Sequence, residues 1–217
     1  MRITWYGHAA FLVEGEGVRI IMDPFGPSSG YDPIDEPADI LTMSQEDDRF
    51  HSHAAGVLGD PVVLNGREIP PEGVVVRGIL FRAVRVWEDL DRRRNPNGMF
   101  FFTLEGVRIA HMGDLGHPLN EDEIAPLRGT DILLALAGGP PTIAIPDLHR
   151  AVEAIQPRIV IPMHYQTGKV RLNIRPVDDF LAAYPAERIE RHDSPTLDVR
   201  RETLPRETKI VVLRHAR

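Results

Sequence analysis

The stretch Gly106-Val107-Arg108-Ile109-Ala110-His111-Met112-Gly113-Asp114-Leu115-Gly116-His117 is the part of the chain that says most about the fold. Its apolar first half predicts a strand at Val107–Ala110. The pair Glu105-Gly106 separates this strand from another apolar run, Met99–Leu104. A short connection that contains glycine between two such runs is typical of a β-hairpin.

The chain before this hairpin predicts a series of short strands separated by turn residues. They lie at Ile3–Tyr6, Ala10–Val13, Val18–Met22, Ile40–Met43, Val62–Leu64, Val74–Arg77 and Ile79–Val86. So many strands imply a second sheet. Gly7-His8 and Asp23–Pro27 fall at strand ends, where loops on a rigid scaffold commonly carry chemistry.

Helices are predicted only in the second half. Asn120, with Glu123 three residues later, is typical of a capped helix start. Apolar residues from Ile145 to Ile155 recur at helical spacing, and this helix should end near Gln156-Pro157. A strand at Arg158–Pro162, a short helix around Val177–Tyr184 and a last strand at Ile210–Leu213 follow. Strands interspersed with helices, together with apolar runs such as Ile132–Leu136, predict an α/β (α+β) fold whose sheets are covered by helices on their outer faces.

Composition limits the class of protein. A chain of 217 residues with 42% hydrophobic residues predicts a single domain over 1–217. A net charge of −7 argues against nucleic acid as a partner, because nucleic-acid binders neutralise phosphates with clustered Lys and Arg. No apolar run reaches the roughly 20 residues of a membrane span. The absence of cysteine and of a signal-peptide pattern favours the cytoplasm.

Five segments together resemble the metallo-β-lactamase superfamily, specifically bacterial metal-dependent hydrolases similar to ascorbate-phosphate lactonase. They are Ile3–Ala9, Ile20–Pro24, Ala38–Ser44, Gly106–His117 and Ile159–Tyr165. The resemblance spans nearly the whole chain. It implies a four-layer αββα sandwich and a two-metal site at one edge, where paired metals activate water and polarise the substrate.

The ligand motif of this family, His-x-His-x-Asp-His, should directly follow Ser44. Here Gln45 and Asp47 stand in place of the first two histidines, Arg49 in place of the aspartate and Phe50 in place of the third histidine. By the same resemblance, Glu88 takes the place of a further histidine, and only Asp114 and His164 match the family ligands. His8 and His111 match positions that brace the site, and we expect both to be hydrogen-bonded structural histidines.

Sliding the motif onto His51-Ser52-His53 fails, because Ala55 and Gly56 would then have to be ligands. We therefore expect His51 and His53 to be polar surface residues.

The altered site predicts altered metal chemistry. Arg49 has no acceptor and Phe50 no ligand atom, so one of the two metals is lost. Oxygen donors remain at Gln45, Asp47, Glu88 and Asp114, and this set suits one hard cation, with Mg²⁺, Mn²⁺ or Ca²⁺ preferred over Zn²⁺. We expect instead that no metal is bound, that zinc stays below half an equivalent, and that Arg49 enters the cavity as a fixed cation paired with Asp114, Asp47 or Glu88.

Two functions follow from these observations. The chain is a divergent hydrolase that uses Asp114 and His164 on an ester, lactone or phosphoester, or it is a non-catalytic ligand-binding or regulatory protein that retains the cleft. Either function implies a small-molecule partner and no membrane. The oligomeric state is open and includes a homo-oligomer.

Overall fold

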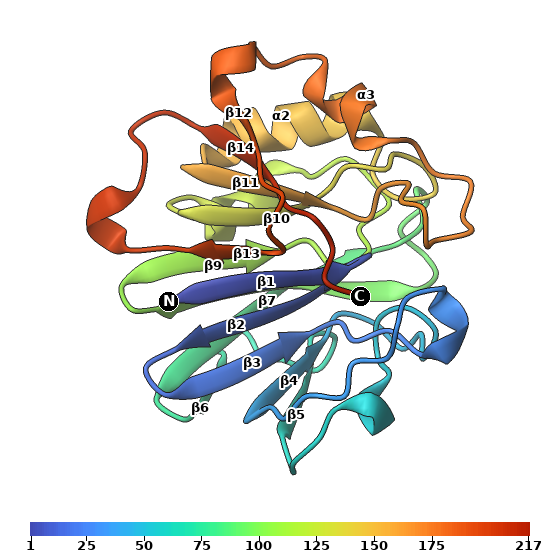
Figure 1. The fold of residues 1–217 in the computed structure, drawn as a ribbon, viewed down its shortest axis with the longest axis vertical. Coiled ribbons are helices and arrows are strands. Elements are labelled where there is room, and N and C mark those ends of the chain that lie inside the picture. The colour runs from blue at the N-terminus through green and yellow to red at the C-terminus, as the bar shows by residue number, and fades with distance from the viewer.

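The computed structural model describes residues 1–217, and two β-sheets facing each other form its centre (Figure 1). The six-stranded sheet has the order β13-β1-β2-β3-β4-β5 and the eight-stranded sheet the order β12-β14-β11-β10-β9-β8-β7-β6. The strands of the first sheet are β1 Arg2–Gly7, β2 Ala10–Gly15, β3 Val18–Met22, β4 Ile40–Met43, β5 Val62–Asn65 and β13 Thr196–Asp198. Those of the second are β6 Val74–Val76, β7 Ile79–Trp87, β8 Pro96–Leu104, β9 Val107–His111, β10 Ile132–Leu136, β11 Ile159–Met163, β12 Ile189–Arg191 and β14 Lys209–Val212.

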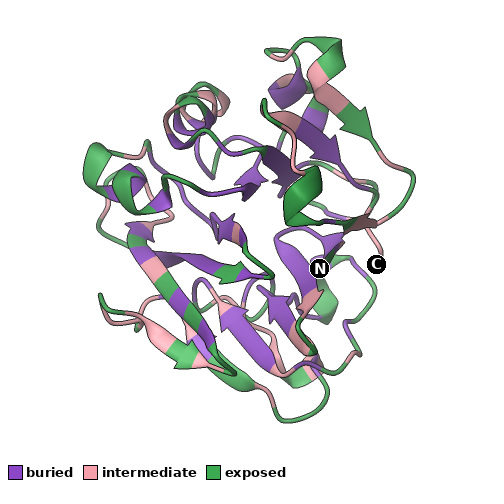
Figure 2. Cartoon of the chain, turned by 90° about the vertical axis from the view of Figure 1, so that its left-hand side faces the viewer, coloured by how far each residue is buried: buried purple, intermediate pink, exposed green.

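The core of 48 buried residues includes the inner faces of both sheets and the helical side of the larger one. β7 alternates buried and exposed residues over part of its length, as a strand with one face in solvent should. β10 and β11 are buried at every position, because helices cover the face of their sheet that points away from the sandwich. Figure 2 shows the buried residues concentrated on the central strands.

Three α-helices, α1 Glu121–Ile124, α2 Ile145–Ile155 and α3 Val177–Leu181, accompany the larger sheet. Asn120 and Glu123 form the capping box that starts α1. α2 buries one stripe, Leu148, Ala151, Val152 and Ile155, and ends at Gln156 in the left-handed conformation, just before Pro157. The predicted helix positions are therefore confirmed.

The outer face of the smaller sheet is covered differently from the αββα prediction. A second cluster of 13 buried residues lies there, where side chains of β1 to β4 meet the loops that cover the sheet. Phe25, Tyr31, Ile34 and Phe50 supply its large side chains. The two facing sheets and the helical layer of the fold class are confirmed, whereas this fourth layer consists of irregular chain.

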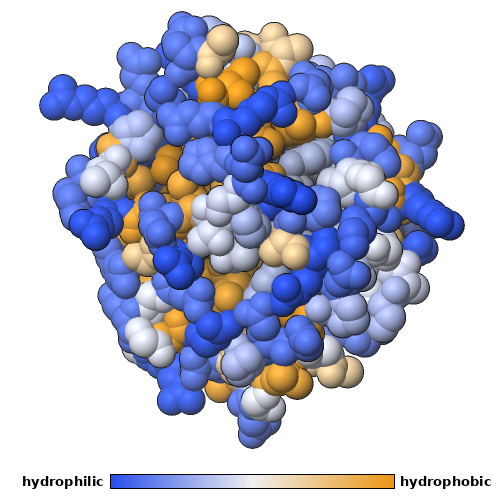
Figure 3. Space-filling view, viewed as in Figure 1, coloured by the Kyte–Doolittle hydropathy of each residue, from blue (hydrophilic) through white to orange (hydrophobic).

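All the predicted strands are present, to within three residues at each end. Only β12 and β13 were missed. Both are three-residue edge strands with polar residues, so they lack the apolar run that marks a strand in sequence. None of the helices has the length and apolar composition needed to cross a membrane. The face shown in Figure 3 is mostly hydrophilic with scattered apolar groups.

The two sheets come into close contact at Gly98 of β8. Its amide donates to the carbonyl of Ser44 at 2.8 Å, which joins the end of β4 to β8. A Cβ at Gly98 would lie 2.4 Å from the carbonyl carbon of Gly66. Only a residue without a side chain allows this approach.

Gly98→Ala should therefore destabilise the fold by about 1–3 kcal/mol, because overpacking forces the backbone apart. Urea unfolding followed by circular dichroism measures the change. Gly168→Ala is the matched control, since a Cβ there meets nothing within 4 Å. Equal midpoints for both variants would show that the contact at Gly98 is not a constraint.

Candidate functional site

Asp114 lies in the loop after β9, buried at the edge of the larger sheet. Its amide donates to Oδ1 of Asn97 at 3.0 Å, and its Oδ2 accepts from Nε2 of Gln45 at 2.6 Å. Its Oδ1 is buried and has no hydrogen-bond partner. The carboxylate is thus held in place with one oxygen available.

His164 follows β11 and meets this free oxygen. Its Nε2 lies 3.3 Å from Oδ1 of Asp114, and its Nδ1 is buried with no partner. Its backbone amide donates to the carbonyl of His8 at 2.9 Å, which ties the end of the larger sheet to the end of β1. The structure therefore brings together the two residues that match the family ligands.

His51 is the third member of the group, and the prediction that it lies on the surface is wrong. Its side chain is 1% exposed. Its Nδ1 lies 2.9 Å from Oδ2 of Asp23, and its Nε2 lies 3.5 Å from Oδ2 of Asp114. His53 is half-buried and bonds Asp48 at 3.0 Å instead. One histidine of the pair thus enters the site without any shift of the motif.

The turn at Asp47 explains this placement. The carbonyl of Asp47 accepts hydrogen bonds from the amides of Phe50, His51 and Ser52. The chain therefore reverses tightly, with Arg49 outside and His51 inside.

His8 completes the group from the end of β1. It is buried, yet neither ring nitrogen has a hydrogen-bond partner. Its ring centroid lies 3.9 Å from that of His164 and 5.3 Å from that of His51. One ligand atom from each of the three residues lies within 4.8 Å of the others. We call His8, His51 and His164 the histidine cluster.

Only one of the two predicted structural histidines is hydrogen-bonded. Nε2 of His111 lies 2.8 Å from the carbonyl of Ala9, and its Nδ1 accepts from the amide of Gly113 at 2.9 Å. Both nitrogens of His111 are used, so it braces the loop as expected. The corresponding prediction for His8 is wrong.

Burial and charge set different protonation states within the histidine cluster. Burial lowers the pKa of His8 well below its usual value, and the neighbouring histidines lower it further. Burial also lowers the pKa of His164. For His51 burial opposes the charged form, but the carboxylates of Asp114 and Asp23 outweigh it and raise the pKa to about 9. Without metal, His51 therefore carries the positive charge of the site.

Arg49 does not enter the cavity, and that prediction is wrong. Its side chain is exposed, its Nε donates to the carbonyl of Ser28 at 3.2 Å, and no carboxylate lies within 4.0 Å of its guanidinium. The guanidinium lies over the ring of Phe50, 4.6 Å from its centroid. Phe50 in turn packs on His8, with 4.6 Å between centroids. Arg49 and Phe50 thus cover the histidine cluster from outside.

The four predicted oxygen donors are not assembled as ligands. The amide of Gln45 donates to Asp114 rather than facing a cation, and the side chain of Asp47 accepts from the amide of Arg49 at 2.9 Å. The carboxylates of Asp47, Glu88 and Asp114 do not all lie within 4.8 Å of one another, since the histidine cluster is the one group of three or more ligand residues at that spacing. Burial, then the charge of Asp114, raises the pKa of the half-buried Glu88.

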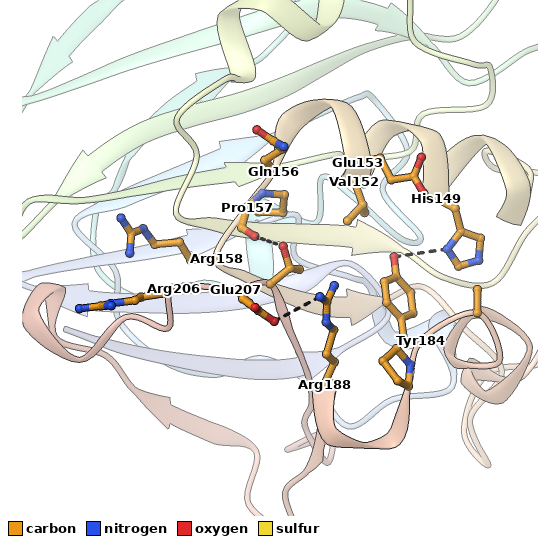
Figure 4. Close-up of a pocket in the computed structure, with 13 residues that line it drawn as sticks. His149, Val152, Glu153, Gln156, Pro157, Arg158, Tyr184, Arg188, Arg206 and Glu207 are labelled. Carbon is orange, nitrogen blue, oxygen red and sulfur yellow. Dashed lines mark hydrogen bonds and ion pairs between the residues drawn. The ribbon is translucent and has the colours of Figure 1, made fainter.

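Two cavities need to be distinguished. Glu88 and Gly116 line a cleft of about 380 Å³. Gly116 follows Asp114 closely in the chain, and the charge of Asp114 acts on Glu88, so this cleft adjoins the site. A larger cavity of about 780 Å³ lies between α2 and the chain before β14 (Figure 4). His149 there bonds Tyr184 at 3.3 Å and stacks on Phe180, so it is a packed residue remote from the histidine cluster.

Comparison with known proteins agrees with this architecture. A profile of the beta-lactamase superfamily domain matches residues 2–164. A UPF0173 metal-dependent hydrolase of Archaeoglobus fulgidus is 28% identical, with 77% of this chain and 84% of the relative covered. One from Methanosarcina mazei is 30% identical over 78% of this chain and 85% of its own. The resemblance to bacterial hydrolases thus extends to archaeal proteins.

A solved structure from Thermotoga maritima, described as a Zn-dependent hydrolase of the metallo-β-lactamase superfamily, is similar over nearly its whole length. It is 32% identical, with a TM-score of 0.80, and covers 98% of this chain and 97% of its own. The profile and the solved structure agree with the two facing sheets, and the relatives agree with the family. The chain belongs to the metallo-β-lactamase superfamily of metal-dependent hydrolases.

Proposed function

We propose that the chain is a hydrolase of small esters, lactones or phosphoesters that works with one divalent transition-metal ion bound by the histidine cluster. The observation that carries this proposal is the unpartnered, buried ring of His8. A buried imidazole with two unpartnered nitrogens has lost its hydration without compensation, so it needs a ligand.

The usual two-metal arrangement does not fit these residues. Phe50 offers no ligand atom, Arg49 points outward, and the amide of Gln45 is bonded to Asp114. A second ion would therefore lack a ligand set.

A single ion fits better. His8 and His164 are held neutral by burial, as metal ligands must be. The bond from Nδ1 of His51 to Asp23 leaves Nε2 facing Asp114, the arrangement in which a carboxylate orients a metal-binding histidine. Three nitrogens with one carboxylate oxygen favour Zn²⁺, Co²⁺ or a similar ion over the hard cations expected from sequence.

When bound, such an ion would lower the pKa of a water molecule and polarise a carbonyl or phosphoryl oxygen. The residues of the chain have separate tasks. Gln45 and Asn97 hold Asp114, and Asp23 holds His51. Glu88, whose pKa is raised, lies at the adjoining cleft and is placed to accept or return a proton.

Metal binding tests the proposal directly. Equilibrium dialysis of the purified chain against Zn²⁺ or Co²⁺, with metal analysis by mass spectrometry, should give about one equivalent. His8→Ala should lose it, and Asp23→Asn should weaken binding by about 10- to 100-fold, as loss of a supporting carboxylate does. His53→Ala, outside the cluster, should bind like the parent. No binding by the parent, or equal binding by His8→Ala, would refute the single-metal site.

Hydrolysis is a separate prediction. The metal-loaded chain should hydrolyse members of a panel of chromogenic small esters, lactones and phosphoesters, and His8→Ala and Asp114→Asn should lower kcat/KM at least 100-fold. His53→Ala again serves as the control. Metal binding without turnover of any panel member, but with saturable ligand binding, would favour the non-catalytic role instead.

The stability of the metal-free chain should depend on pH through His51. Its folded pKa of about 9 exceeds the unfolded value of about 6.5, so its stabilising contribution is full below pH 6.5 and is lost as the pH rises through 9. The lowered pKa values of His8 and His164 change the free energy of unfolding only below about pH 7.5, because histidines of the unfolded chain titrate there. Between pH 7.5 and 9.5 the Tm should therefore fall, and His51→Gln should remove this fall. A pH-independent Tm in the parent would show that His51 is neutral.

A further inference from the structure

A third cavity, of about 560 Å³, lies at the opposite edge of the larger sheet from the histidine cluster. Asp131 and Arg158 line it, directly before the parallel strands β10 and β11. His164 follows β11 at its other end, so the length of this strand, at about 3.3 Å per residue, places the two sites roughly 16–20 Å apart. A ligand in this cavity is therefore not the substrate of the histidine cluster.

The lining of this cavity is strongly basic, although the chain as a whole has a net charge of −7. Four arginines line it, Arg108, Arg128, Arg158 and Arg201, together with one carboxylate, Asp131. Arg128 is paired with Glu121 outside the lining. Four positive charges against these two carboxylates leave a surplus of about two.

Arg108 contributes most to this surplus, because no carboxylate lies within 4.0 Å of its guanidinium. Its terminal nitrogens donate to the carbonyls of Arg128 and Pro126, and the group lies over the ring of Phe101 at 4.9 Å. It is half-buried; burial and the neighbouring Arg82 lower its pKa, and the nearby carboxylate of Asp131 partly offsets them. The side chain is thus fixed in place while its charge is only partly compensated.

Arg158 and Arg201 contact Asp131 only loosely. Nε of Arg158 lies 3.4 Å from one carboxylate oxygen, and a terminal nitrogen of Arg201 lies 3.6 Å from the other. Strong charge-assisted bonds are about 2.7–2.9 Å long. Figure 4 shows Arg158 extending away from the ion pair of Arg188 with Glu207 in the neighbouring cavity. Nη1 of Arg158 donates to the carbonyl of Pro205 at 3.2 Å, and Nη1 of Arg201 donates to that of Gly106. Each guanidinium therefore has its Nη2 available to another anion.

We propose that this cavity binds a small molecule with a pyrophosphate-like group. Guanidinium groups bind phosphate oxygens in pairs of parallel hydrogen bonds, and Arg108, Arg158 and Arg201 line this one cavity. A volume of about 560 Å³ suits a small ligand. An anion with two or more charges would neutralise the surplus without displacing Asp131. The limited volume favours a compact ligand over the extended backbone of a nucleic acid.

Isothermal titration of the full chain with sodium pyrophosphate, after metal removal with chelator and dialysis, tests the proposal. One pyrophosphate should bind per chain, at least tenfold more tightly than inorganic phosphate. Arg201→Gln and Arg108→Gln should each weaken binding about tenfold or more. Arg191→Gln is the matched control, because Arg191 is a similarly exposed arginine paired with Asp178 on another surface.

Arg201 is 64% exposed, so its variant tests the site even if Arg108→Gln fails to fold. Equal affinities for the parent and Arg201→Gln would overturn the proposal, as would equal losses in Arg191→Gln. Tighter binding of single-stranded RNA than of pyrophosphate, lost in the same variants, would replace the small ligand with a nucleic acid. Loss of binding in His8→Ala would place the anion at the histidine cluster instead.

Discussion

The carboxylate of Asp23 is the interaction on which the site depends. It is buried, accepts bonds from the amide and hydroxyl of Ser44, and bonds His51. Burial alone would raise its pKa, but the nearby His111 and His51 outweigh burial and lower it. One ionised group therefore fixes the ends of β3 and β4, the start of the loop after them and the orientation of His51. A buried carboxylate with fewer partners would be too costly to keep charged.

Most of the fold could be predicted because its signals are local. Apolar runs broken by turn residues marked the strands, and the helical spacing of apolar residues and the pair Gln156-Pro157 marked α2. Asp114 and His164 could be assigned because the segments around them resemble the family. The cover of the smaller sheet could not be predicted in this way, since it consists of loops, which have no periodic pattern.

The remaining site residues were missed for a different reason. Motif alignment assigns a position in the chain, whereas a tight turn decides which side chain points inward. The turn at Asp47 turns Arg49 outward and His51 inward, and nothing in the order of the residues shows this. His8 was placed near the site correctly, but its lack of partners depends on packing with Phe50, His51 and His164. The charge compensation expected from Arg49 is instead provided by His51, whose pKa the carboxylates of Asp114 and Asp23 raise.

The backbone of His8 has one more consequence. Its carbonyl accepts both the amide of His164 and the indole Nε1 of Trp5, so this residue joins the two sheets through main chain as well as through its ring. His8 and His51 belong to the smaller sheet, and His164 and Asp114 to the larger. An ion held between them would link the two sheets of the sandwich to each other. Separation of the sheets would then require its release, so metal loading would slow unfolding and lengthen the lifetime of the chain against proteases.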